Sequence, residues 1–270
     1  MTANLRVVSL ASGSSGNCIL VQTAEASLLI DAGLSAKTIV AELARLGVSP
    51  SSLQAVLLSH EHGDHVGGVR TLARRFKVPI LSNEATLTAA KIDPARAEIL
   101  KTGGVARVGS VTVSSFGLPH DSREATGFFI EYDRWRVCLA TDLGHAPESL
   151  VEYVHAADLV VLEANHDRRW LANGPYPAAL KARILSDVGH LANEDCAHLI
   201  ARAASGRPQW VWLAHLSEVN NTPRRAIKCV RTRLEQESIA SVQVAVALRD
   251  QRSLIWHSDQ TWVQPALVGL

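Results

Sequence analysis

Metal-ligand side chains are concentrated in one short run of the sequence, SHEHGDH, at residues 59–65. Its H-x-H-x-D-H pattern supplies three imidazoles and a carboxylate, ligands that suit Zn²⁺, Mn²⁺ or Fe²⁺. The run follows the apolar segment 55–59, which predicts a buried strand. Because neighbouring residues of a strand point to opposite faces, Asp64 and His65 can converge on a metal only where the strand has given way to a loop. The run therefore predicts a metal site on a loop at a strand end.

The run resembles the H-x-H-x-D-H loop of the metallo-β-lactamase superfamily, which binds two metals between two β-sheets. The resemblance implies further ligands after apolar, strand-like segments: His120 in LPHDS, Asp142 in LATDLGH and His215 in WLAHLS. In this superfamily an Asp at the position of Asp142 bridges the metals, whereas a Cys ligand there belongs to another branch. Cys138 lies four residues earlier and is interpreted as buried core.

The resemblance also assigns the ligands to two metals. One metal would be held by His60, His62 and His120, the other by Asp64, His65 and His215, with Asp142 bridging them. Asp31, in LLIDAG, is similar to the superfamily's supporting carboxylate, which accepts the N–H of a ligand imidazole; alternatively it simply ends a strand. The expected cofactors are two divalent metal ions, Zn²⁺ or Mn²⁺ before Fe²⁺. A hydroxide between them would attack an electrophilic phosphorus or carbonyl.

The metal site alone does not name the substrate, because the superfamily hydrolyses lactams, thioesters, lactones and phosphodiesters. His190, in GHLAN, resembles a histidine of ribonuclease Z-type nucleases that contacts the scissile phosphate and protonates the leaving oxygen. Glu163, in LVVLEANHD, resembles the glutamate that supports it. A carboxylate-braced imidazole suits this proton transfer at neutral pH. Glu163, His190 and the ligand Asp64 are therefore the expected catalytic residues, although a lone His before a helix is more often a cap or surface residue.

The resemblance extends over roughly residues 5–235, through SLASGSSGNC, SHEHGDHVGG, TDLGH, EANHD with NGPYP, GHLAN and HLSEVNNTP. These segments together resemble the YycJ/WalJ group of metallo-β-lactamase-fold proteins, which is associated with 5′ to 3′ DNA exonuclease activity. The resemblance implies a dinuclear-metal phosphodiesterase whose substrate is nucleic acid, with DNA as the first expectation.

Candidate substrate contacts are polar or basic residues near the expected site: Ser14, Ser15, Asn17, His166, Asn220, Asn221, Arg224 and Lys228. The first three belong to a Gly/Ser loop that lacks a G-K-[ST] ending, so no nucleotide cofactor is expected. Arg224 and Lys228 share a basic stripe with Arg231, which by default is an ordinary solvated helix face. Trp170 and Tyr176 are candidate stacking platforms for bases, with core packing the more common role of each.

The composition is that of a globular protein without bulk charge. The 270 residues (29.1 kDa) are 47% hydrophobic, and 27 Lys and Arg nearly balance 26 Asp and Glu. Nucleic acid must therefore be bound locally. The four cysteines form no C-x-x-C pair, which argues against a disulfide framework or a thiolate zinc site. Without a charged leader or an apolar run of about 18 residues, a cytoplasmic enzyme with no membrane partner is expected.

Strands mixed with helices throughout the chain predict an α/β fold, and the resemblance implies the four-layer αβ/βα sandwich. Strands are expected at 5–10, 18–22, 27–31, 55–59, 110–116, 127–132, 136–141, 158–163 and 209–214. Helices are expected from Ser35 to Gly47 and at 66–76, 147–155, 177–186, 193–204 and 223–235. A single domain, 1–270, is predicted, with 165–189 as an insertion over the site. The last thirty-odd residues carry no usable motif.

Three alternatives remain open at this stage. The same site could serve a ribonuclease or a small-molecule phosphodiesterase. It could also serve a thioesterase or lactonase, which would need neither His190 nor a basic rim. Outside enzymology, the chain could be a metal-bound nucleic-acid-binding module that has lost catalysis. The sequence does not indicate protein partners or an oligomeric state.

Overall fold

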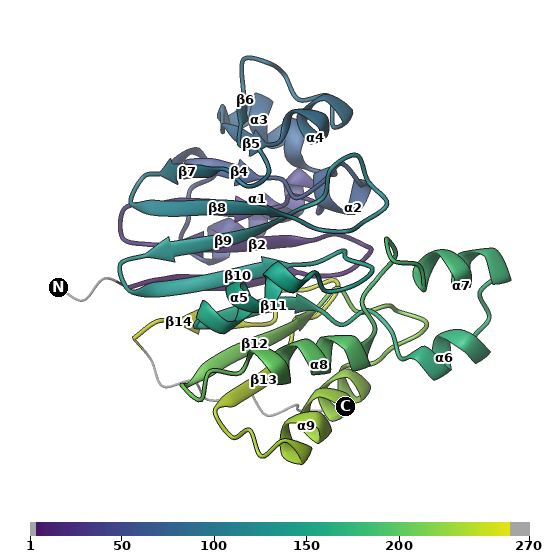
Figure 1. Ribbon diagram of the computed structural model, residues 1–270. Coiled ribbons are helices and arrows are strands. Elements are labelled where there is room, and N and C mark those ends of the chain that lie inside the picture. Colours follow the sequence, from purple (N-terminus) through teal and green to yellow (C-terminus); the bar gives the residue numbers. More distant parts are fainter. Residues whose placement is uncertain (1–3, 260–270) are drawn as a thin grey trace.

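Two mixed β-sheets lie face to face, and helices cover their outer faces (Figure 1). This computed structural model describes residues 4–259. The first sheet has the order β14-β1-β2-β3-β4-β5-β6 and the second the order β13-β12-β11-β10-β9-β8-β7. The predicted four-layer α/β sandwich is thereby confirmed.

The strand bounds agree with most of the predicted segments. The first sheet consists of β1 (Arg6–Ala11), β2 (Cys18–Gln22), β3 (Ser27–Ile30), β4 (Ala55–Leu57), β5 (Ile80–Ser82), β6 (Ala97–Ile99) and β14 (Ile255–His257). The second consists of β7 (Val105–Val108), β8 (Val111–Gly117), β9 (Thr126–Tyr132), β10 (Trp135–Ala140), β11 (Leu159–Glu163), β12 (Gln209–Ala214) and β13 (Val242–Val246). Five strands, β5, β6, β7, β13 and β14, have no counterpart in the prediction.

Most helices also fall in predicted segments. They are α1 (Ala36–Arg45), the 3₁₀ turn η1 (Pro50–Ser52), α2 (Gly63–Val66), α3 (Val69–Phe76), α4 (Glu84–Ala89), α5 (Glu148–Ala156), α6 (Arg168–Asn173), α7 (Ala178–Ile184), α8 (Asn193–Ala203) and α9 (Pro223–Gln236). Ser35 and Thr222 cap α1 and α9 through their hydroxyls, as expected of N-cap residues. Helices α4 and α6 were not predicted. None of the described helices is long and apolar enough to span a bilayer.

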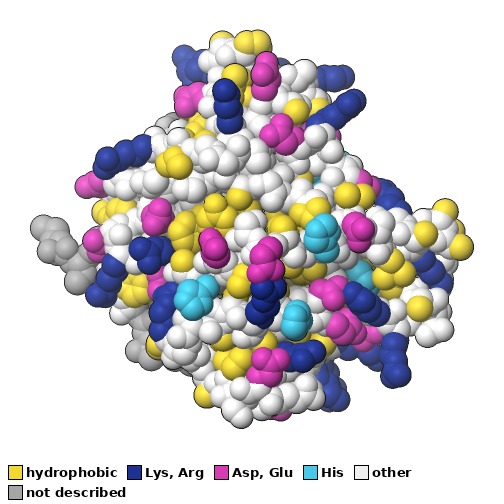
Figure 2. Space-filling model, viewed as in Figure 1, with side chains coloured by type: hydrophobic (Ala, Val, Ile, Leu, Met, Phe, Trp, Pro, Cys, Tyr) yellow, Lys and Arg dark blue, Asp and Glu magenta, His cyan; other side chains and the backbone are white. Residues whose placement is uncertain are grey.

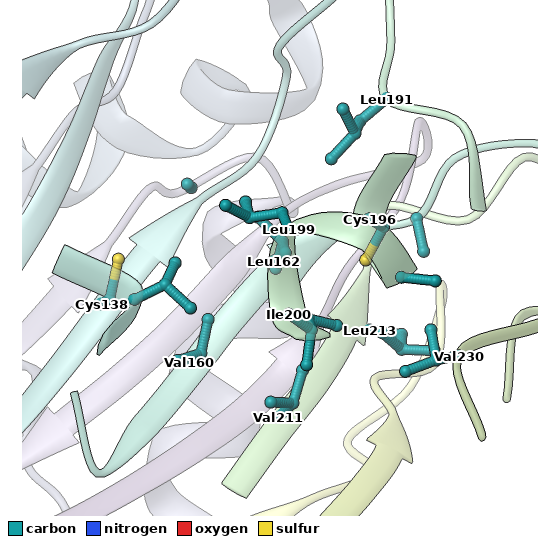
Figure 3. Close-up of a cluster of buried hydrophobic side chains, with 14 of the residues drawn as sticks. Cys138, Val160, Leu162, Leu191, Cys196, Leu199, Ile200, Val211, Leu213 and Val230 are labelled. Carbon is teal, nitrogen blue, oxygen red and sulfur yellow. The ribbon is translucent and has the colours of Figure 1, made fainter. Parts of the chain in front are cut away.

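Three apolar layers explain why the chain forms a sandwich. Strand β11 alternates between them: Leu159 and Val161 face the core between the sheets, whereas Val160 and Leu162 face the helices. The helix-side layer of the second sheet is shown in Figure 3, where Cys196 and Ile200 of α8 lie over the strands. Cys138 is fully buried in this layer, which confirms its interpretation as core. A third layer lies between the first sheet and helices α1 and α3.

Parallel pairing places the functional side chains at one edge of the sandwich. Strands β3 to β6 are parallel, and so are β10 to β13, with Leu162 of β11 opposite Leu213 of β12. The carboxyl ends of parallel strands open onto the same edge, where α/β proteins bind ligands. Asp31 and His215 directly follow β3 and β12, and Asp142 follows β10 after one residue, so the three arrive at this edge together.

The structure corrects two expectations about the chain between and beyond these strands. The expected helix at 66–76 begins only at Val69, as α3, and a separate helical turn, α2, precedes it, so that Asp64 and His65 belong to a helical turn, not to a loop. The break lies where the chain packs against the 32–34 segment: Gly68 N–H donates to Ala32 O, and a Cβ on Gly33 would come within 1.6 Å of Asp64 O. Beyond residue 235, β13 and β14 complete one edge of each sheet.

Candidate metal centre

Three imidazoles from two loops form the first ligand group. Nε2 of His60 lies 3.1 Å from Nδ1 of His62, which lies 3.4 Å from Nε2 of His120. One nitrogen from each ring falls within 4.8 Å of the others. Burial, with the charge of His65, holds the pKa of His60 well below its usual value, and burial also lowers the pKa of His120. The rings of His60 and His120 are therefore neutral at neutral pH, the state in which imidazole binds a metal.

A second group joins the helical turn α2 to the end of β12. Oδ2 of Asp64 lies 3.4 Å from Nε2 of His215 and 3.6 Å from Nε2 of His65. Burial alone would lower the pKa of both imidazoles, but neighbouring carboxylates raise the pKa of His65 to about 10 and that of His215 well above its usual value. A cation bound there would displace these protons, as metal binding to histidine generally does.

Asp142 lies between the two groups. Its Oδ2 is 3.1 Å from Nε2 of His65, and its Oδ1 is 3.9 Å from Nε2 of His120. Burial alone would raise its pKa, but His215 and His65 bring the pKa well below the usual value. Within residues 4–259 its buried Oδ2 makes no hydrogen bond. An orphaned, ionised carboxylate oxygen between two histidine groups fits two divalent cations bridged by Asp142.

Three site residues adopt left-handed backbone conformations that the sequence did not indicate. The φ angles are +59° at Asp31, +63° at Asp142 and +54° at His215. Such angles are strained for residues with a side chain, least so for Asp and Asn, and each costs about 1 kcal/mol or more. The strain falls where three parallel strands end, so it redirects the chain at the point where the ligands must converge. The amide of His215 is held there by donating to Oγ of Ser12.

Asp31 fixes the orientation of His65. Its Oδ2 accepts from Nδ1 of His65 at 2.7 Å, which leaves Nε2 facing the ligand group. The same carboxylate accepts from the amide and hydroxyl of Ser59 at 2.8–3.0 Å, and that hydroxyl also lies 3.0 Å from Nδ1 of His60. Ser59 was not among the predicted site residues. Its place beside the His-rich run was the available signal, since a hydroxyl there can contact adjacent ligands.

Replacing Asp31 with Asn is expected to weaken metal binding by about 10- to 100-fold, the usual effect of removing a carboxylate that supports a ligand histidine. Asn tolerates the left-handed backbone, so the fold is retained. Competition with a chromogenic chelator measures the change. Asp133→Asn is the matched control, because Asp133 is exposed on the β9–β10 turn at φ +53°. Equal metal affinity in the Asp31 variant and the control would contradict the assigned role.

Glu163 connects His190 to the ligand His215. Oε1 of Glu163 accepts from Nδ1 of His190 at 2.9 Å and from Nδ1 of His215 at 2.8 Å, while Oε2 accepts from the amides of Leu143 and Leu191. Burial would raise its pKa, but His190 and these hydrogen bonds lower the pKa of Glu163 to about 2. Burial alone would lower the pKa of His190, but the charge and the hydrogen bond of Glu163 raise it. A charged His190 with a 22% exposed side chain can donate a proton to a bound substrate.

The loop before His190 is fastened to the ligand loops. Nδ1 of His120 donates to Gly189 O at 3.0 Å, and the amide of Asp121 donates to Val188 O. Nδ1 of His145 also lies 3.0 Å from Asp187 O, in the same segment. The candidate ligand His120 and His190 are thus positioned by one shared segment.

The Gly/Ser loop supplies one contact to the ligands and two exposed hydroxyls. The buried Asn17 lies against the second ligand group: its Nδ2 is 3.3 Å from Oδ2 of Asp64 and 3.0 Å from Nε2 of His65. Ser14 lines a pocket that also contains His190, whereas Oγ of Ser15 lies 3.5 Å from Arg249 O, away from the ligands. The structure therefore brings Ser14 and Asn17 to the site.

The predicted contacts in HLSEVNN and EANHD are buried. Asn221 is 2% exposed and its amide is occupied by Ala164 O, Asn165 O and the side chain of Asn193. Asn220 and His166 are also buried, and within the described chain their polar side-chain atoms have no hydrogen-bond partner. Asn221 is thus placed as a structural group between strand ends, because its amide is already fully bonded.

The basic residues of α9 do not all lie at the metal centre. Lys228 lines a groove with Arg225, Arg233 and Glu194, and none of the proposed metal ligands borders it. In residues 4–259 Arg224 forms no ion pair, whereas Arg225 pairs with Asp167 and stacks over Trp170. Figure 2 shows basic and acidic side chains interspersed over one face, in keeping with the near-zero net charge.

The chain is similar to known metal-dependent hydrolases. The Beta-lactamase superfamily domain matches residues 27–215. Exodeoxyribonuclease WalJ of Streptococcus pneumoniae is 38% identical over 237 residues, covering 85% of this chain and 88% of WalJ. Exodeoxyribonuclease YycJ of Bacillus anthracis is 36% identical over 233 residues, covering 84% and 88%. The metallo-beta-lactamase fold protein YhfI of Bacillus subtilis superposes with a TM-score of 0.71 at 18% identity, covering 95% of this chain and all of YhfI.

Proposed function

The chain belongs to the beta-lactamase superfamily as a metal-dependent hydrolase of the exodeoxyribonuclease kind, and we propose that it removes nucleotides from the ends of DNA. The similarity to WalJ and YycJ spans most of both proteins, which supports a shared substrate class. By the same similarity we propose 5′ to 3′ polarity.

One observation carries the proposal: Glu163 bonds to both His190 and the proposed ligand His215. A phosphodiester leaves as an alkoxide, which must be protonated or neutralised as the bond to phosphorus breaks. A carboxylate that holds an imidazolium beside the ligand groups meets this need.

We propose that His60, His62 and His120 hold one divalent ion and that Asp64, His65 and His215 hold the other, with Asp142 bridging. The ions, Zn²⁺ or Mn²⁺ before Fe²⁺, would supply a nucleophilic hydroxide and stabilise charge on the phosphate. The protein itself orients the ligands through Asp31 and Glu163, and His190 gives its proton to the leaving oxygen. Asp64 contributes as a ligand of the reacting centre.

The surroundings of the site support two further parts of the proposal. Helices α6 and α7 project beside the ligand loops in Figure 1, which supports the segment 165–189 as an insertion over the site of a single domain. All four cysteines, Cys18, Cys138, Cys196 and Cys229, are free, which supports a reducing compartment such as the cytoplasm.

The decisive assay uses protein purified without chelator, with metal content measured first. Matched end-labelled DNA and RNA, a cyclic nucleotide and a thioester are then each tested with Zn²⁺ and Mn²⁺. We expect about two metals per chain and stepwise shortening of DNA from its 5′ end. Faster cleavage of RNA, or turnover of the thioester alone, would contradict the proposal, and metal-bound protein inactive on every substrate would indicate a binding module.

A further inference from the structure

A pocket of about 180 Å³ adjoins His190 on the side of the α6–α7 segment. From its chemistry we infer that it binds the nucleoside at the end of the strand through its base and sugar, without selecting for a terminal phosphate. This inference rests on the proposed nuclease function and deepens it by naming which part of the substrate end is recognised.

The outer wall of the pocket is apolar and aromatic. It is formed by Tyr176, between α6 and α7, and by Leu180 and Ile184 of α7. Tyr176 and Leu180 are half-buried and Ile184 is buried, so the wall is already formed before a ligand arrives. An aromatic ring beside aliphatic side chains offers a stacking surface that accepts any base. This wall therefore suits the flat base of a nucleotide and depends little on which base is present.

A second set of lining residues is polar but uncharged. It includes Ser14 from the Gly/Ser loop, Asn165 after β11 and Ser217 after β12. Oγ of Ser217 accepts from the amide of Asn220, so its own proton is available to a ligand. Neutral hydroxyl and amide groups suit the hydroxyls and oxygens of a sugar, and the edge of a base, better than they suit a dianion.

The charges that line the pocket are already compensated. Arg183 forms an ion pair with Asp121, which lines the same pocket. His190 is held by Glu163. A terminal phosphate carries about −1.5 to −2 charges at neutral pH and is normally bound by several charge-assisted hydrogen bonds. Because Arg183 and His190 are both paired, a terminal phosphate gains little in this pocket.

The position of His190 identifies which nucleoside the pocket holds. In the proposed reaction the water oxygen bonds to phosphorus, the bond from phosphorus to the leaving oxygen breaks, and the leaving oxygen takes the proton of His190. Since His190 lines the pocket, the nucleoside inside is the one that carries the leaving oxygen. The pocket has room for one nucleoside, not a base pair, so each turnover releases one terminal unit: a mononucleotide from a 5′-phosphorylated end and a nucleoside from a 5′-hydroxyl end.

The test combines a variant with a modified substrate. Tyr176→Ala should raise KM for DNA about 10-fold with a smaller change in kcat, because stacking contributes about 1–3 kcal/mol per base. A substrate with an abasic terminal sugar should show the same loss with the unmodified enzyme and no further loss with the variant. Tyr176→Phe should restore KM. Leu185→Ala, an exposed position just after α7, is the matched control.

Terminal chemistry provides the second measurement. We expect kcat/KM for DNA with 5′-phosphate and 5′-hydroxyl ends to agree within about threefold. A preference of about 100-fold for the phosphate would overturn the inference, and so would additive losses from Tyr176→Ala and the abasic end.

Saturation-transfer NMR with deoxyadenosine and chelator-treated protein separates the two proposals. Nucleoside signals that weaken in Tyr176→Ala, together with no DNA cleavage, would leave the pocket standing and refute the nuclease. Cleavage of DNA, together with nucleoside signals that Tyr176→Ala leaves unchanged, would support the nuclease and refute the nucleoside pocket.

Discussion

Asp142→Asn is expected to lower kcat/KM for metal-dependent cleavage by at least about a thousandfold, which corresponds to about 4 kcal/mol of transition-state stabilisation. The carboxylate lies between both ligand groups, 3.1 Å from His65 and 3.9 Å from His120. An amide offers one neutral oxygen in place of two charged ones, so it cannot bridge two cations as a carboxylate does. Asn also tolerates φ +63°, so the loss would not arise from the backbone.

Initial rates on end-labelled DNA and metal content by mass spectrometry check this prediction together. We expect the variant to retain its thermal transition without metal and to bind fewer than two metals per chain. Asp133→Asn, an exposed aspartate with a similar backbone angle, should match the unmodified protein. Full activity of Asp142→Asn would refute the bridged centre.

His190→Ala is expected to slow cleavage of DNA by about 100- to 10,000-fold, the usual contribution of a general acid, while metal content stays unchanged. The loss should shrink to a few-fold on a phosphodiester with a p-nitrophenyl leaving group, because that group departs without a proton. Exposed His198 on α8 provides the matched control, His198→Ala. Equal losses on both substrates would show that His190 positions the substrate instead of protonating it.

The pH profile gives an independent reading of the same role. The pKa of His190 is raised, chiefly by Glu163 against the effect of burial, so its proton is lost at a higher pH than that of an ordinary histidine. The rate of the unmodified enzyme should therefore fall at alkaline pH, and His190→Ala should lack this basic limb. Glu163→Gln, which removes the charge that raises this pKa, should move the limb to lower pH.

Much of the candidate centre could be inferred from sequence because its residues stand at the ends of strands. The H-x-H-x-D-H run and the single residues His120, Asp142 and His215 each follow an apolar segment. Apolar periodicity marks where a strand is buried, and parallel pairing brings such ends to one edge. The predicted segments for β2 and β12 agree with the structure to the residue.

Elements without their own periodicity were missed. Strands β5 and β6 have three residues each, too short to show a pattern, and β13 and β14 are recognisable as edges only once the sheets are assembled. The break between α2 and α3 depends on contact with the 32–34 segment, which lies about thirty residues earlier and is invisible to local rules.

The sequence by itself predicted the α/β fold class from its pattern of apolar segments, and the resemblance of its motifs to a known superfamily implied the metal-ligand residues and the pairing of Glu163 with His190. Only the tertiary structure decided which side chains form hydrogen bonds and ion pairs with one another. It showed that Glu163 contacts both His190 and His215, and that Asn221 is fully bonded within the protein. Hydrogen bonding and charge compensation act over about 3–4 Å between residues distant in sequence, so they exist only once the chain has folded.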